Sequence, residues 1–474
     1  MRRRDFIRRV ARAGTGAAMV APSLFGLAAW SFATPAQAQA AHRAFGYGPL
    51  RPTVDLPDLH VPDGFRVVRL SESLQPAVGH PELIVPNAFD GMAAFPLPNG
   101  NIRLIRNHEM QDPAGIGPAL GAPAYDAKAT GGTSSLEVRI TGTGEGRKVE
   151  VIDEFISLAG TRVNCAGGPT PWSSWLSCEE NTNGPSHGFD QPHGYVFEVP
   201  VGATGPVDPV PLKAMGRFVH EAVAVDAATG IVYETEDIRF DVTDPARPGA
   251  GFYRFLPHER GRLAEGGRLQ IMAVDQLPGF VTVWGMRPGE TLPATWIDIE
   301  DPDPSGAEAD PSAVFREGLA KGAAVFARLE GAWHADGGIY IVSTDGGRAR
   351  AGQVFFYRPT SADRGELTLV FESPSREVLD APDNICVTPR GGVILCEDGP
   401  GDEFIRGLNR EGLIVDLVRQ PHEVGQPEPG EFAGACMSPD GAVLFFNVQG
   451  STSSKSEVTS STYALWGPWE EGGL

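Results

Sequence analysis

Positive charge is scarce in this 474-residue chain. Lysine and arginine together number 39, against 60 aspartates and glutamates, so the formal net charge is −21. A nucleic-acid-binding protein would carry basic stripes that neutralise phosphates, and the charge balance therefore argues against that class of partner. Such an acidic chain suits bound cations or simple solubility.

Several common catalytic signatures are missing as well. We find no phosphate-binding glycine loop, no nucleophile elbow that would set a serine between a strand and a helix, and no zinc-type spacing of cysteine and histidine. Long helices are disfavoured because 59 glycines and 41 prolines make up about one residue in five. Coiled coils, collagen and wholesale disorder are excluded, and many short strands are expected.

The N-terminus reads as a targeting segment. A twin-arginine pattern at 3–7 is followed by a mostly apolar stretch at 17–32 and an Ala-x-Ala site within 36–40. We expect residues 1–40 to be a Tat signal that the Tat translocase reads, with no stable membrane span because Pro22 and small residues interrupt the apolar stretch. Its removal would lower the net charge from −21 to −26. The expected location is periplasmic or secreted.

Cysteine is rare, with five residues at 165, 178, 386, 396 and 436. An odd number in an oxidising compartment leaves at least one thiol outside any disulfide. Cys386 and Cys436 fall within apolar strands and are expected to be buried as small hydrophobic residues. Cys178 differs because two glutamates follow it.

A repeated unit organises the chain between its turn signals. Each copy has an apolar strand, a turn rich in Pro, Asp or Gly, a second apolar strand and then acidic residues. Two further strand-like segments follow most of these hairpins, for example at 194–199 and 210–212 behind the second hairpin and at 251–255 and 269–274 behind the third. Four strands repeated six times predict an all-β, six-bladed β-propeller spanning residues 41–474 as a single domain. Residues 65–70 could close the ring, and an insertion at about 238–320, with a short helix from about 312, reaches over one face.

The polar ends of these hairpins predict a binding site. In an antiparallel hairpin, the start of the first strand and the end of the second lie together, so the acidic tails should converge at one mouth of the central channel. Close carboxylates repel strongly, and cations offset that repulsion. Oxygen ligands suit Ca²⁺, whereas the Cys178 thiolate suits a transition metal. Any single acidic tail is also consistent with a solvated turn. His108 and His220 are expected to brace neighbouring loops through hydrogen bonds.

The motifs together resemble the PhoX-type alkaline phosphatases, which are Tat-exported six-bladed propellers with an iron and calcium cluster. The matching stretches are Arg106-Asn107-His108-Glu109, Cys165-Ala166-Gly167-Gly168, Trp175 to Asn181, Gly216 to Glu221, Arg328 to Gly331, Ser343 to Gly346, Asp383-Asn384, Cys396 to Gly399 and Phe432 to Cys436. The chain departs from the family in two ways. Its segments between blades are short, and it has Pro169-Thr170-Pro171-Trp172 at a place where family members often have a glycine before a Thr-Trp pair.

The resemblance implies a bridging thiolate from Cys178 between two Fe³⁺ ions, with nearby carboxylates holding iron and Ca²⁺. The expected metal ligands are Cys178, Glu179, Glu109, Glu221, Glu236, Glu330, Asp345, Asp383 and Glu397. Arg328 and Asn164 are the expected catalytic residues, and Arg328 would grip the substrate phosphate or, alternatively, pair with the acidic mouth.

The expected activity is metal-dependent hydrolysis of small-molecule phosphate monoesters by a monomer. Two alternatives stay open on the sequence. One is a calcium-dependent propeller that hydrolyses lactones or other esters, and the other is a non-catalytic metal-bound propeller.

Overall fold

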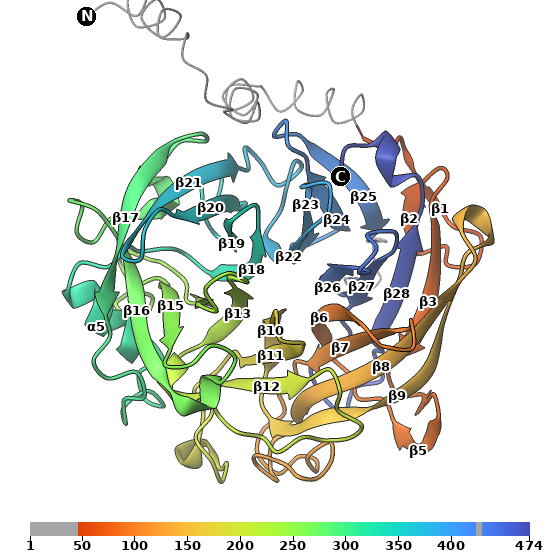
Figure 1. The fold of residues 1–474 in the computed structure, drawn as a ribbon, viewed down its shortest axis with the longest axis horizontal. Helices are drawn as coiled ribbons and strands as arrows, with labels where there is room; N and C mark the ends of the chain where they lie inside the picture. Colours follow the sequence, from red (N-terminus) through yellow and green to blue (C-terminus); the bar gives the residue numbers. More distant parts are fainter. Residues whose placement is uncertain (1–45, 423–428) are drawn as a thin grey trace, which may run out of the picture.

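The computed structural model describes residues 46–422 and 429–474, which form a ring of six β-sheet blades around a central channel (Figure 1). The expected Tat signal at 1–40 lies outside these residues. Within the described residues, no helix is long and apolar enough to cross a membrane.

Each blade begins with the predicted hairpin, whose first strand is innermost. Blade one consists of β6 (Phe89–Pro96), β7 (Ile102–His108), β8 (Gly131–Thr141) and β9 (Lys148–Thr161). Blade two consists of β10 (Asn164–Pro169), β11 (Ser174–Glu179) and β12 (Val196–Pro200). Blade three consists of β13 (His220–Val225), β14 (Val232–Glu236), β15 (Phe252–Pro257) and β16 (Gly267–Val274).

The other three blades repeat this order. Blade four consists of β18 (Leu329–Ala335), β19 (Gly338–Ser343), β20 (Gln353–Pro359) and β21 (Arg364–Glu372). Blade five consists of β22 (Pro382–Val387), β23 (Val393–Glu397), β24 (Glu403–Leu408) and β25 (Ile414–Gln420), extended by β2 (His60–Pro62) and β1 (Leu50–Pro52). Blade six consists of β26 (Phe432–Met437), β27 (Leu444–Val448), β28 (Ser461–Trp466) and β3 (Arg66–Glu72).

Strand β3, which follows β1 and β2 in the chain, closes the ring, as the sequence predicted for residues 65–70. It pairs antiparallel with β28, with Val67 opposite Leu465 and Arg69 opposite Tyr463. The innermost strands contact one another in the closed order β6, β10, β13, β18, β22, β26 and back to β6. The ring is therefore held by pairing of segments from the two ends of the described chain.

One expectation about strands needs correction. Residues 210–212 were expected to form a fourth strand of blade two, but a single backbone bond from Leu212 N to Val196 O, 2.9 Å long, is followed by a 3₁₀ turn at Lys213–Met215. The segment 238–320 contains β15 and β16, the third and fourth strands of blade three, where strand-like segments at 251–255 and 269–274 were expected. Beyond them it adds β17 (Thr291–Asp298), which joins β16 to β21, and the helix α5 (Ala313–Ala320) where a helix was expected.

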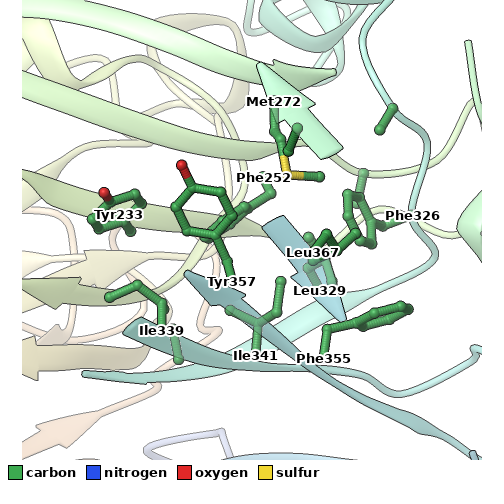
Figure 2. Packing of buried hydrophobic residues seen from close by; sticks show 14 of the residues in the cluster. Tyr233, Phe252, Met272, Phe326, Leu329, Ile339, Ile341, Phe355, Tyr357 and Leu367 are labelled. Atoms are coloured by element: carbon green, nitrogen blue, oxygen red, sulfur yellow. The ribbon is translucent and has the colours of Figure 1, made fainter. Parts of the chain in front are cut away.

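Apolar side chains fill the spaces between blades. Between blades three and four, Tyr233, Phe252 and Tyr357 pack together with their ring centroids 5.6–5.9 Å apart (Figure 2). Leu329 at the start of β18 is fully buried in the same cluster. Each such side chain contributes about 1.5–3 kcal/mol through burial, so the blades form a rigid frame for the channel mouth.

Candidate metal centre

One backbone hydrogen bond recurs in every blade and defines the channel mouth. The residue after the second strand donates its N–H to the carbonyl of the residue before the first strand, over 2.8–3.1 Å. The six donor residues are Glu109, Glu180, Asp237, Thr344, Asp398 and Gln449. Four of these six equivalent positions carry a carboxylate, which places charge from successive blades at one level of the channel.

A β-bulge follows at the start of each innermost strand. The register shifts after Phe89, Asn164, His220, Leu329, Pro382 and Ala433, each time between the first and second strands of the blade. A bulge re-aims the side chains beside it. In the first five blades, the residue that follows the first paired residue of the innermost strand is Asp90, Cys165, Glu221, Glu330 or Asp383.

Backbone strain recurs next to these positions in four blades. Ala88, Val163, Arg328 and Ala381 each precede an innermost strand, and all four have positive φ angles of 46–54°. Non-glycine residues rarely adopt this left-handed conformation, which costs about 1 kcal/mol or more and tends to occur at functional sites.

Carboxylates and one cysteine thiol at the channel mouth form four overlapping groups of possible metal ligands. In each group, one possible ligand atom per residue lies within 4.8 Å of the others. The groups are Cys165, Glu180 and Glu221; Glu221, Glu330 and Asp383; Asp383, Asp398 and Glu431; and Asp90, Glu109 and Glu431. A cavity of about 240 Å³ opens between them, lined by Glu109, Gln111, Cys165, Glu180, Arg328, Glu330, Asp383, Asp398, Glu431, Gln449 and Thr452.

Burial is the main cause of the raised pKa values in this cavity. It raises the pKa of Glu109 to about 7, against hydrogen bonds from Gln111 and Gln449 that lower it. Burial and then the neighbouring Asp398 raise the pKa of Asp383 to about 7. Burial also raises the pKa of Glu221 well above its ordinary value. Without a compensating cation, this many carboxylates cannot all ionise together.

Cys165 is the cysteine that lies among these carboxylates. Its Sγ lies 3.1 Å from Glu221 Oε1 and 3.7 Å from Asp90 Oδ2. The pKa of this thiol is raised, first by burial and then by Asp90 and Glu221. A bound cation would reverse that balance and favour the thiolate.

Arg328 lines the same cavity. Its Nε donates to both oxygens of Asp237 at 3.0 and 3.1 Å, and its Nη2 lies 2.6 Å from Glu330 Oε1. Burial acts to lower the pKa of Arg328, but Glu330 and Asp237 outweigh it and raise the pKa. The guanidinium is therefore held charged at the mouth.

Cys178, the expected bridging ligand, lies away from the channel mouth. Cys178 is fully buried in the apolar cluster between blades two and three, with Leu176, Val196 and Phe218. It belongs to none of the ligand groups found among the described residues. Strand alternation explains the difference, because Cys178 points into the interior between blades.

Glu179 also lies away from the cavity. Its Oε1 lies 2.6 Å from His193 Nδ1, and its Oε2 accepts hydrogen bonds from the backbone N–H groups of Gly194 and Tyr195 at 2.8 and 3.1 Å. The carboxylate is satisfied by protein donors, which leaves the neighbouring Glu180 to face the mouth.

Four further expected site residues are engaged elsewhere. Glu236 accepts from Tyr253 Oη at 2.8 Å, and Glu397 pairs with Arg406 Nε at 2.5 Å. Asp345 pairs with Arg239 Nη1 at 2.9 Å. Asn164 is buried between Thr161 and Ser177, with side-chain bonds of 2.7 and 2.9 Å. None of the four lines the cavity, and none joins a ligand group among the described residues.

Of the expected residues, Glu109, Glu221, Glu330, Asp383 and Arg328 are brought to the mouth. Asp90, Cys165, Glu180, Asp398 and Glu431 also lie there; they belong to the hairpin ends expected at the mouth but were not among the expected ligands. A signal was present for Cys165, since it occupies the same place in its strand as Asp90, Glu221, Glu330 and Asp383. His108 and His220 brace the surroundings as expected: His108 contacts Asn87 O at 2.8 Å and His220 contacts Gly216 O at 3.1 Å.

Comparison with known proteins agrees with this architecture. Residues 45–451 match the family model described as Alkaline phosphatase PhoX. The chain is similar to Pseudomonas fluorescens PhoX in complex with vanadate, a transition state analogue, with a TM-score of 0.63 and 18% sequence identity over 90% of this chain and 97% of that chain.

More distant similarity is found in two other solved structures. A luciferin-regenerating enzyme has a TM-score of 0.41 at 9% identity, covering 85% of this chain and 96% of that one. Virginiamycin B lyase from Staphylococcus aureus has a TM-score of 0.36 at 10% identity, covering 85% and 98%. No curated protein matches the chain in sequence.

The family match spans most of the chain and includes every residue of the four ligand groups. The resemblance noted in the sequence is thereby confirmed. This chain belongs to the alkaline phosphatase PhoX family of metal-dependent hydrolases of phosphate esters.

Proposed function

We propose that this chain hydrolyses phosphate monoesters at the acidic mouth with Fe³⁺ and Ca²⁺ as cofactors. The group of Cys165, Glu180 and Glu221 would hold iron, because a thiolate is a softer ligand that suits a transition metal. The groups that contain only carboxylates, such as Asp383, Asp398 and Glu431, would suit Ca²⁺. Cys165 takes the role that the sequence analysis gave to Cys178.

Unpartnered buried atoms support bound cations at this place. Asp90 Oδ1 and Glu221 Oε2 are both buried, and neither has a hydrogen-bond partner among the described residues. A buried carboxylate oxygen without a partner is costly, and a cation ligated by it removes that cost. The donor set therefore fits the metals that the family implies.

Arg328 is placed to hold the phosphoryl group. Its Nε and Nη2 are held by Asp237 and Glu330, while Nη1 makes no hydrogen bond with a described residue. The guanidinium is thus fixed in position with one donor edge available, which suits binding of a phosphoryl oxygen. This arrangement combines the two roles considered for Arg328, an ion pair with the mouth and a phosphate clamp.

This arrangement gives the bound cations and the protein side chains different chemical roles. Bound cations would supply Lewis acidity that neutralises the phosphoryl oxygens and promotes attack on phosphorus. Arg328 would orient the phosphoryl group, and the buried walls would exclude bulk water. The lactonase or esterase alternative requires no thiol among the carboxylates, so the position of Cys165 favours the phosphatase.

Replacement of Arg328 by lysine tests the clamp. Arg328→Lys keeps the positive charge but loses the planar fork, and we expect kcat/KM on a phosphate monoester to fall about 10- to 100-fold, as for a lost hydrogen bond to a charged group. Arg348→Lys is the control, since Arg348 pairs with Glu372 outside the cavity and its side chain is 59% exposed. Equal activity of the two variants would refute the clamp.

We also propose that the chain is a monomer exported through the Tat pathway to the periplasm or beyond. The twin arginines at 3 and 4 support the export route. Replacing both with lysine should retain the precursor in the cytoplasm, as cell fractionation would show, and unchanged export would refute a Tat route.

A further inference from the structure

The cavity wall holds few donors that remain available to a substrate. Six of its eleven lining residues are carboxylates, which only accept hydrogen bonds when ionised. The amide of Gln449 is shared between Asp90 at 2.6 Å and Glu109 at 2.9 Å, and the amide of Gln111 donates to Glu109 at 2.7 Å. A phosphate ester presents only acceptor oxygens to such a wall, so any further free donor there would matter.

Thr452 carries the only hydroxyl group among the residues that line the cavity. It lies in the loop between β27 and β28 of blade six, two blades away from Arg328 in blade four. Its side chain makes no hydrogen bond with any described residue. The hydroxyl is therefore not committed to the protein, unlike the two glutamine amides.

The backbone around Thr452 is fixed by blade one. Gln111 N donates to Thr452 O at 2.9 Å, while Ser453 Oγ and Ser454 N donate to the two oxygens of the buried Asp112 at 3.0 and 2.9 Å. A loop held on three contacts presents its side chain in a defined position and loses little entropy when a ligand binds.

We propose that the Thr452 hydroxyl contacts the substrate and donates a hydrogen bond to an oxygen of the phosphate ester, from the wall of the cavity formed by blade six. With Arg328 holding the phosphoryl group from blade four, the hydroxyl from blade six helps to set the orientation of the ester. This inference rests on the proposed phosphatase function and adds a recognition residue that carries no charge and binds no metal.

The pair Thr452→Val and Thr452→Ser tests this role in the metal-loaded full chain. Valine keeps the shape of threonine and removes the hydroxyl, so we expect kcat/KM on a phosphate monoester to fall about 10- to 100-fold, with weaker inhibition by inorganic phosphate. Serine restores the hydroxyl and should recover most of the activity. The melting temperature and the metal content should match the wild type in both variants.

A control variant separates this effect from general disturbance of the loop. Ser456→Ala removes a hydroxyl from the same loop outside the cavity, where it accepts a bond from Val458 N at 3.2 Å, and it should keep wild-type kinetics. Wild-type kcat/KM in Thr452→Val, or no recovery in Thr452→Ser, would overturn the proposal.

The proposed function can fail separately, and the same variants distinguish the two cases. If the metal-loaded wild type turns over no phosphate monoester, calorimetric binding of inorganic phosphate decides the role of Thr452. Weaker phosphate binding by Thr452→Val alone would support the contact without the reaction, and equal binding by all variants would overturn the contact.

Discussion

The surroundings of Cys165 and Cys178 determine what each sulfur can do. Cys165 Sγ lies between Glu221 and Asp90, at 3.1 and 3.7 Å, whereas Cys178 packs against aliphatic and aromatic side chains. A thiol in the first environment can become a thiolate ligand once a cation binds, and a thiol in the second behaves as a small hydrophobic residue.

Serine substitutions at the two cysteines should therefore differ in kind. Cys165→Ser should remove most of the transition metal and the hydrolysis while the β-sheet circular dichroism persists, because a hard hydroxyl replaces a soft ligand. Cys178→Ser should keep the metal and lose about 1–3 kcal/mol of unfolding free energy, since it buries a hydroxyl among apolar groups. Elemental analysis and urea unfolding measure both, and the opposite pattern would restore Cys178 as the ligand.

His193 is a titratable residue outside the metal centre whose charge affects stability. Burial acts to lower its pKa, but Glu179 and Asp126 outweigh this and raise the pKa from 6.5 to about 9. A histidine whose folded pKa is raised contributes stability that is fully present below pH 6.5 and is lost as the pH rises through 9.

The wild type should consequently lose up to about 3 kcal/mol of unfolding free energy from this residue between pH 6 and pH 9.5. His193→Gln should lack that part of the pH dependence, which urea unfolding at the two pH values would reveal. His258→Gln, at an exposed position, serves as the control. Identical pH slopes for the wild type and His193→Gln would show that His193 does not carry the charge.

At the scale of the strand, alternation explains which expected residues reach the mouth. Each of the pairs Glu179-Glu180, Glu236-Asp237 and Glu397-Asp398 can send only one side chain toward the channel, because side chains alternate between faces. The first residue of each pair was the expected ligand, whereas the structure places the second at the mouth. Sequence patterns locate a strand end only to within a few residues, and an error of one residue reverses the face.

The blade repeat, the ring closure and the helix near 312 were predictable from the sequence. They depend on turn residues and apolar alternation that recur along the chain, so an error of one residue does not change them. The bulges at the starts of the innermost strands were not predictable, because they have no single sequence signature. They position Cys165 and its four carboxylate counterparts, and the ligand set therefore needed the structure.

Close contact between neighbouring innermost strands can be tested at Gly331. A Cβ at this position would lie 2.6 Å from Asp383 O and 2.8 Å from Ile385 N, both backbone atoms of blade five. Gly331→Ala should cost about 1–3 kcal/mol of unfolding free energy and reduce metal content, since it pushes β22 and Asp383 outward. Gly202→Ala, with open space around the new Cβ, is the control. Unchanged stability and metal content in Gly331→Ala would show that the two strands can separate freely.

For the whole molecule, the ring brings acidic residues from all six blades to one confined mouth. The carboxylates of Asp90, Glu221 and Asp383 come from three different blades, yet all have raised pKa values with burial as the main cause. Folding therefore brings acidic groups together at an electrostatic cost, which bound cations would offset. Cations that bind only the folded state would stabilise that state against unfolding.

Removal and return of the metals test this account most directly. Iron and calcium should be measured by elemental analysis in the exported protein, together with phosphate monoester hydrolysis and the melting temperature, before chelation, after it and after the metals are added back. We expect chelation to abolish hydrolysis and lower the melting temperature, and added metals to restore both. Full hydrolysis and an unchanged melting temperature in protein shown to be free of metal would contradict the account.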